Sequence, residues 1–185
     1  TFEIARNRVR VNDSTGIASI AVGSSSGSVF EGSIHDNRVE SSSSASGEGI
    51  QLIGTSAAAP SVAVYSNQIS GNIATGLIFW PSGQSNIVVA DNAIRSSVVN
   101  GQGVTLVFAA GAGNTLDANV FNNTVVGFSL GILVNGPITG RISNNILAYA
   151  QGQGIKLQTS TMPEDHDLFF GNGTPQSSLG TGSLV

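Results

Sequence analysis

The stretch Ile-His-Asp-Asn-Arg-Val at residues 34–39 decides the fold, because its pattern recurs along the chain. The pattern is an aliphatic residue, two variable residues, Asn, one variable residue and a second aliphatic residue. A degraded further copy is expected at residues 169–172. The recurring Asn residues are Asn7, Asn37, Asn67, Asn92, Asn123 and Asn145, at intervals of 30, 30, 25, 31 and 22 residues. Repeats of about this length are typical of solenoids, in which each copy stacks on the next.

A second pattern follows each Asn by 8 to 12 residues, and it consists of Gly and then an aliphatic segment. Its copies are Gly16-Ile17, Gly49-Ile50, Gly76-Leu77, Gly103-Val104, Gly131-Ile132 and Gly154-Ile155. Apolar and variable residues alternate in both patterns, as they do in half-buried strands. We expect Gly at this point because a Cβ would crowd the neighbouring coil.

Each Asn is expected at a tight bend between two short strands, because Asn tolerates the left-handed backbone region and bonds nearby backbone groups. Stacked coils would place successive amides about 4.8 Å apart, close enough to form a hydrogen-bonded ladder. The alternative is a β-sandwich, which would show Asn-Gly hairpin signals between its strands. The pairs Asn100-Gly101, Asn135-Gly136 and Asn172-Gly173 fall outside the repeat phase, which favours the stacked fold.

Composition excludes several classes of function. The 185 residues contain no Cys, so neither a disulfide framework nor a zinc-thiolate site is available. A net charge of -4 leaves no basic footprint for nucleic acid. No apolar run reaches about 18 residues, so we expect no membrane insertion.

The copies IARNRV, IHDNRV, VYSNQI, VADNAI and ISNNIL, with the segments that follow them, resemble the right-handed parallel β-helix repeats of the pectin-lyase-like superfamily. The resemblance is specific for fold and not for activity. It implies an all-β, single-stranded right-handed parallel β-helix of about six coils, with three short strands per coil and an Asn ladder. We expect residues 1–172 to form this β-helix, without upstream coils and an N-terminal cap, and residues 173–185 to form a Gly/Ser/Thr-rich tail.

The alternation predicts which side chains leave the coil after each Asn. The position one residue after Asn is occupied by Arg8, Arg38, Gln68, Ala93, Thr124 and Ile146, and the position three residues after it by Arg10, Glu40, Ser70, Arg95, Val126 and Ala148. This face is therefore charged in the first two coils and apolar in the last two. Guanidinium groups match carboxylates, so we expect an acidic sugar chain to bind Arg8, Arg10, Arg38, Glu40 and Asp36. The alternative is a solvated cluster of ion pairs.

The segment after each Gly predicts another outward row, formed by Ala18, Gln51, Ile78, Thr105, Leu133 and Lys156. Trp80 stands two residues beyond Ile78. We include Trp80 among the candidate substrate-binding residues, since its ring could stack on a sugar. It could equally be covered by a loop or by a neighbouring protein, because exposed apolar patches mark contacts.

Catalytic signals are weak, and no catalytic residue is assigned. Asp36 and Asp91 share a row but lie two coils apart, about 10 Å by the strand spacing. The signatures of the superfamily's polygalacturonases, calcium-dependent pectate lyases and uronate epimerases are absent. The densest polar spot, residues 164–167, is either a cation or general-base site or a polar turn into the last strand, and His35 beside Asp36 is a second acid–base candidate. No metal ligand set is assigned and no cofactor is expected.

Three functions follow from these observations. The first is a non-catalytic, extracellular or cell-surface module, of bacterial or phage origin, that presents a rigid face to a polysaccharide or a protein partner. The second is a fragment of a carbohydrate-active enzyme: a polysaccharide lyase, a glycoside hydrolase or a uronate epimerase. The third is a structural spacer or assembly subunit that contacts other chains end to end or side by side.

Overall fold

The computed structural model describes residues 1–12, 19–24, 31–42, 47–54, 61–81, 83–97, 100–108, 115–174 and 182–185. Their strands form three parallel sheets of seven, seven and six strands. The first sheet holds β1 (Phe2–Ala5), β4 (Glu31–His35), β7 (Ser61–Tyr65), β10 (Gln84–Ala90), β13 (Thr115–Phe121), β16 (Ile138–Ser143) and β19 (Glu164–Asp165). The second holds β2 (Arg8–Val11), β5 (Arg38–Ser41), β8 (Gln68–Gly71), β11 (Ala93–Ser96), β14 (Thr124–Val126), β17 (Ile146–Ala148) and β20 (Leu168–Phe170). The third holds β3 (Ile20–Ser24), β6 (Gly47–Gly54), β9 (Ile73–Trp80), β12 (Gln102–Val107), β15 (Leu130–Asn135) and β18 (Gln153–Gln158).

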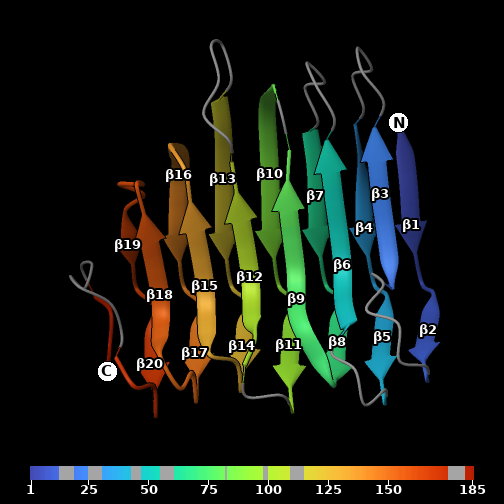
Figure 1. The fold of residues 1–185 in the computed structure, drawn as a ribbon. Helices are drawn as coiled ribbons and strands as arrows, with labels where there is room; N and C mark the ends of the chain where they lie inside the picture. Colours follow the sequence, from blue (N-terminus) through green and yellow to red (C-terminus); the bar gives the residue numbers. More distant parts are fainter. Residues whose placement is uncertain are drawn as a thin grey trace.

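Every third strand pairs with its counterpart in the next coil, so the chain winds through the three sheets in turn. Figure 1 shows the chain descending through the first and second sheets at the back and rising through the third at the front while it advances from right to left, which is a right-handed helix. The predicted right-handed parallel β-helix with three strands per coil is confirmed. Among the described residues, β1–β18 make six coils and β19 and β20 begin another.

The core consists of vertical files of aliphatic side chains. The alternation of each strand turns one set of residues inward, and the coil register stacks equivalent residues on one another. One such file is Ile34, Val64, Val89, Val120 and Ile142, all with no exposed surface. Fully burying each of these side chains contributes about 1.5 to 3 kcal/mol.

The Asn ladder runs the length of the described helix. The backbone N–H and the side-chain amide of Asn67 both donate to Oδ1 of Asn92 at 3.0 Å, and the same amide donates to the carbonyls of Tyr65 and Ile34 at 2.9 Å. Equivalent amide-to-Oδ1 bonds of 2.9–3.0 Å join Asn7 to Asn37, Asn37 to Asn67, Asn92 to Asn123 and Asn123 to Asn145.

The bend differs from the prediction in one respect. The Asn itself was expected to adopt the left-handed conformation, but the residue before each ladder Asn does so. Arg6, Asp36, Ser66, Asp91, Asn122 and Asn144 have φ between 53° and 58°, and so does His166, which precedes Asp167. A left-handed conformation costs a non-glycine residue about 1–2 kcal/mol. The ladder offsets this cost, because the bend places the Asn amide where its donors and acceptor are satisfied. The ladder Asn thus supplies hydrogen bonds, while its predecessor supplies the turn.

The last rung of the described ladder is Asp167, so the further copy predicted at residues 169–172 is out of register. Asn145 donates to Oδ1 of Asp167 from its backbone N–H at 2.5 Å and from its amide at 2.9 Å. Asn172 instead lies after β20, where its Oδ1 accepts from the backbone N–H of Ala150, which follows β17, at 2.7 Å. An acidic residue replaces the amide because Oδ1, the atom that accepts from Asn145, is common to both side chains.

The predicted steric role of the repeated glycines is confirmed. A Cβ at Gly76 would lie 2.3 Å from Cγ2 of Ile94 and 2.5 Å from the carbonyl oxygen of Gly103 in the next coil. The first predicted copy of this pattern, Gly16-Ile17, lies outside the described residues. The register pairs Ile20 with Ile50. The sequence GIASIAV, residues 16–22, allows either Ile17 or Ile20 to lie opposite Ile50. The structure uses Ile20, so β3 begins three residues later than expected.

At the other end of the chain, Leu184 forms a parallel bridge with Leu168 and thereby covers the edge of β20. Among the described residues, no helix has the length and apolar character needed to cross a membrane.

Replacing Asn92 by Ala should weaken the fold, because Asn67 would lose the acceptor of two hydrogen bonds inside a buried ladder. We expect the free energy of unfolding to fall by about 2 to 4 kcal/mol, measured by chemical denaturation. Asn86→Ala, at an exposed position on β10, is the control and should change it by less than about 0.5 kcal/mol. Equal effects of the two substitutions would contradict a stabilising role for the ladder.

Candidate functional site

Three arginine side chains converge on one carboxylate on the outer face of the second sheet. Arg10 Nε lies 2.9 Å from Oε2 of Glu40, Arg8 Nη2 lies 3.2 Å from the same oxygen, and Arg38 Nε and Nη2 lie 2.7 and 2.6 Å from Oε1. The guanidinium-bearing side chains remain 55–59% exposed, whereas the Glu40 side chain is 24% exposed. The predicted cluster of Arg8, Arg10, Arg38 and Glu40 therefore exists.

The coil register explains this convergence. Arg8 lies opposite Arg38 and Arg10 lies opposite Glu40 between β2 and β5, so alternating outward positions meet across adjacent strands. Hydrogen bonds from Arg10, and then from Arg38 and Arg8, lower the pKa of Glu40 to about 2. Glu40 is thus ionised at any physiological pH, and the cluster carries a net charge of about +2.

The basic character of this face extends beyond the predicted cluster to Arg95, which belongs to the predicted outward row but is not one of the predicted site residues. Arg95 lies opposite Ser70 and Val126 on the neighbouring strands β8 and β14. A groove of about 290 Å³ runs between Arg38 and Arg95 over the small side chains of Ser70, Ala93 and Thr124. Four of the chain's seven basic residues thus point outward from this one sheet.

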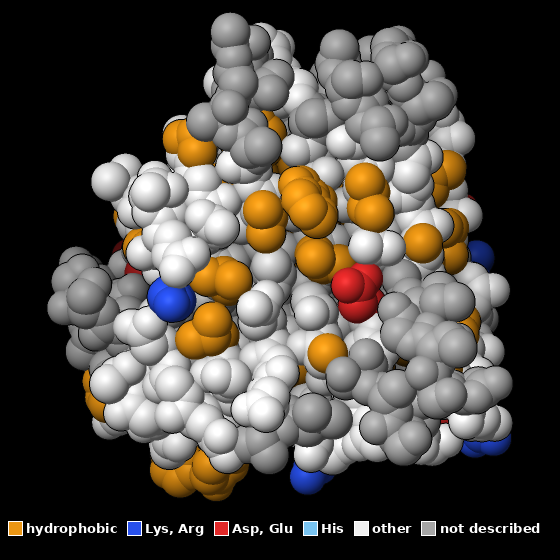
Figure 2. All heavy atoms as spheres, viewed as in Figure 1, with side chains coloured by type: hydrophobic (Ala, Val, Ile, Leu, Met, Phe, Trp, Pro, Cys, Tyr) orange, Lys and Arg blue, Asp and Glu red, His pale blue; other side chains and the backbone are white. Residues whose placement is uncertain are grey.

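The far end of the same face is apolar, as the outward rows predict. Ile146, Leu168 and Phe170 are 42%, 38% and 57% exposed. Tyr149 is 56% exposed and meets Phe170 edge to face, with ring centroids 5.4 Å apart. Along the lower edge of Figure 2, basic side chains lie beneath β2 and β11, and hydrophobic side chains gather beneath β17 and β20.

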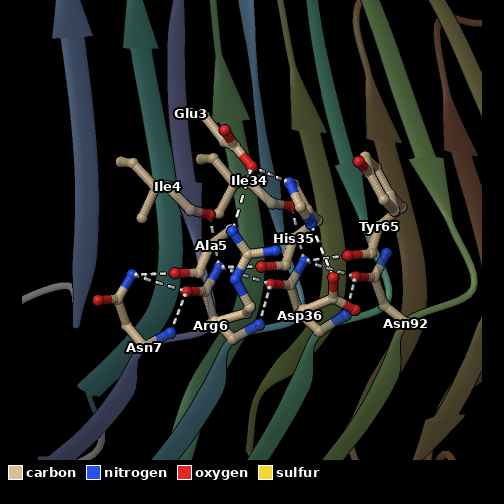
Figure 3. A network of polar contacts seen from close by, with 12 residues as sticks. Glu3, Ile4, Ala5, Arg6, Asn7, Ile34, His35, Asp36, Tyr65 and Asn92 are labelled. Carbon is tan, nitrogen blue, oxygen red and sulfur yellow. Dashed lines mark hydrogen bonds and ion pairs between the residues drawn. The ribbon is translucent and has the colours of Figure 1, made fainter.

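The structure places Asp36 apart from the arginine cluster, beside His35. Its carboxylate lies 2.8 Å from Nδ1 of His35, and Glu3 of the preceding coil lies 2.9 Å from Nε2 of the same ring (Figure 3). The ring also stacks on Tyr65 at 4.7 Å. The hydrogen bond to Asp36, followed by that to Glu3, raises the pKa of His35, because both carboxylates favour the protonated ring. Alternation along the strand could not reveal this, because Asp36 stands at the left-handed bend where alternation is interrupted.

Trp80 lies on a different face again, the outer surface of the third sheet. It is 51% exposed and stands opposite Ile53 in the register. Figure 2 shows hydrophobic side chains gathered over β6, β9, β12 and β15 on this face. The register aligns the predicted row of Gln51, Ile78, Thr105, Leu133 and Lys156. Two members of this row, Thr105 and Leu133, are nevertheless buried, at 2% and 8% exposed. Ala18 lies outside the described residues, and Ala21 occupies its predicted place opposite Gln51.

The polar spot at residues 164–167 is split between inside and outside. Glu164 and Asp167 are 6% and 1% exposed, whereas the His166 side chain is 57% exposed. Ser183 donates to Glu164 and accepts from the backbone N–H of Asp167, so the tail closes over the two acids. This arrangement favours the polar turn over the cation site. No group of three His, Cys, Asp or Glu that could hold a metal ion occurs among the described residues.

These buried acids predict a pH-dependent stability. Burial, with the neighbouring Glu164 as a further cause, raises the pKa of Asp167 from 3.8 to about 7. Between these values the folded chain holds a proton that the unfolded chain has released, so this group's contribution to stability falls as pH rises from about 4 to 7. Asp167→Asn keeps the acceptor for Asn145 and removes the titration. We expect a flatter profile and, at pH 8, a free energy of unfolding higher by about 1 kcal/mol or more.

The matched control is Asp117→Asn, at an exposed position on β13, which should retain the wild-type pH dependence. Thermal unfolding at pH 4 to 8 measures both variants. An Asp167→Asn profile as steep as the wild type would refute the role of Asp167.

The fold and the arginine-bearing face define the class: a right-handed parallel β-helix with a basic outer sheet. A family model described as periplasmic copper-binding protein (NosD) matches residues 2–127, which is more than half of the chain, and the chain therefore belongs to this family. The family's description places its members in the periplasm, outside the cytoplasm. Comparison with the curated proteins and with the solved structures finds no match.

Proposed function

We propose that this β-helix is a binding module that acts outside the cytoplasm and presents the outer face of its second sheet to an anionic polysaccharide. The observation that carries the proposal is the distribution of charge. The whole chain has a net charge of -4. Yet Arg8, Arg10, Arg38 and Arg95 share one face on which Glu40 is the single acid among the described outward side chains.

The geometry suits carboxylates in particular. Each guanidinium group has five N–H donors, and the bonds to Glu40 use only a few of them. The remaining donors on these exposed side chains are available to a ligand. A rigid sheet holds the arginines at fixed spacing, which reduces the conformational entropy that binding would cost.

The copper named in the family description finds poor support in the ligands of this chain. Both ring nitrogens of His35 lie within 2.9 Å of carboxylates, and Met162 is 3% exposed in the core. The other histidine, His166, has its Nδ1 2.7 Å from Asp165, and Cys is absent. These residues do not bring soft or imidazole ligands together, as a copper site requires. We therefore base the proposal on the anion-binding face and not on copper.

Arg38→Gln tests the proposal directly. We expect the affinity for polygalacturonate, measured by titration calorimetry at low salt, to fall about tenfold or more, since a charge-assisted hydrogen bond contributes about 1.5 to 3 kcal/mol. Arg141→Gln is the control, because Arg141 is equally exposed but pairs with Asp165 on the first sheet. No binding of acidic polymers by the wild type, or equal losses in both variants, would refute the proposal.

Glu40→Gln should act in the opposite direction. Removing the ionised carboxylate frees three guanidinium groups and raises the net charge of the cluster to about +3. We expect tighter binding of polygalacturonate, by about threefold to tenfold at low salt, with a steeper dependence on salt concentration. A loss of affinity in Glu40→Gln would mean that Glu40 itself contacts the ligand or holds the arginines in their binding positions.

A further inference from the structure

The charged and apolar ends of the second sheet are joined by two continuous files of outward positions, in which Ala148 is the one buried member among those the register pairs. One file runs Arg8, Arg38, Gln68, Ala93, Thr124, Ile146 and Leu168, each paired with the next in the register. The file two residues further on runs Arg10, Glu40, Ser70, Arg95, Val126, Ala148 and Phe170. A ligand that lies across the strands would therefore meet both ends.

The middle of this surface is low, which leaves space for such a ligand. Ser70, Ala93, Thr124 and Val126 are small and line the groove that begins at Arg38. Parallel strands are about 4.8 Å apart, so the five steps from Arg38 on β5 to Leu168 on β20 span about 24 Å. This length suits an extended polymer and exceeds the reach of a small anion.

The apolar end has the composition of a stacking platform. Tyr149 and Phe170 are both more than half exposed and fix each other edge to face at 5.4 Å. Ile146 and Leu168 extend the apolar surface beside them. Aromatic rings offer large, rigid apolar contact at little entropic cost. Exposed apolar clusters of this kind mark contact sites.

We propose that Tyr149 and Phe170 form the second anchor of the same polysaccharide, so that one extended chain spans the second sheet from Arg38 to Phe170. This inference rests on the proposed function and names its ligand more closely. The acidic groups of this polysaccharide would bind the arginines, and the apolar face of one of its sugar rings would pack on Tyr149 and Phe170. A simple polyanion without apolar faces satisfies only the first anchor. Contact with the aromatic pair therefore distinguishes a polysaccharide long enough to reach both anchors from a shorter one.

The test compares a trisaccharide and a decasaccharide of galacturonate on four variants, by titration calorimetry. In the wild type we expect the decasaccharide to bind at least about tenfold more tightly, because it reaches both anchors. Phe170→Ser and Tyr149→Ser should each reduce decasaccharide affinity about tenfold and leave trisaccharide affinity unchanged. Trp80→Ser on the third sheet should change neither, and Arg38→Gln should weaken both.

The outcomes separate the two proposals. If Arg38→Gln weakens binding while both aromatic variants bind the decasaccharide as the wild type does, the second anchor is refuted and the anion-binding function stands. If Arg38→Gln has no effect, the proposed function fails. Equal affinity for inorganic polyphosphate, or for single-stranded oligothymidylate of the same length, would also overturn the inference, because sugar rings would then not be recognised. Circular dichroism of each variant establishes that it is folded.

Discussion

The hydrogen bonds of the Asn ladder are the interaction on which this structure depends. The amide of Asn67, for example, joins its own strand, the coil before it and the coil after it at 2.9–3.0 Å and has no exposed surface. Because buried amides must be satisfied, the coils cannot shift relative to one another without losing several bonds at once. The register of the three sheets, the packing of the aliphatic files and the alignment of outward side chains all follow from that restriction.

Much of this arrangement could be predicted from the sequence, because it repeats. The spacing of Asn37, Asn67 and Asn92 is sufficient to predict the ladder, and alternation around them correctly assigned Arg8, Arg38 and Glu40 to one face. The errors fall where the simple alternation of strand residues fails. The first Gly-strand copy has two possible registers, Asp36 occupies a bend, and Tyr149 has a φ of 55° outside the repeat. Asp167 could have been found, since Glu-x-x-Asp-x-Phe at residues 164–169 keeps the repeat spacing with acids in place of the aliphatic residue and Asn.

The three candidate groups named in the sequence serve different surfaces. The arginines and Glu40 lie on the second sheet, Asp36 joins His35 at the bend, and Trp80 lies on the third sheet. A one-dimensional list of polar and aromatic residues cannot distinguish these surfaces, because a single coil visits all of them within about 30 residues. Only the positions relative to the ladder Asn assign a side chain to its sheet. Membership of a copper-binding family likewise does not reveal the ligand of this chain, since both ring nitrogens of its buried histidine, His35, lie within 2.9 Å of carboxylates and Cys is absent.

The left-handed bends and the ladder bonds make no use of the two outward side chains that follow each Asn. Mutation can therefore alter those positions at little cost to folding, one coil at a time, while the scaffold beneath them stays constant. In evolutionary terms the second sheet is a surface whose specificity can change independently of its architecture. Relatives with the same coils and unrelated ligands are the natural result of that separation.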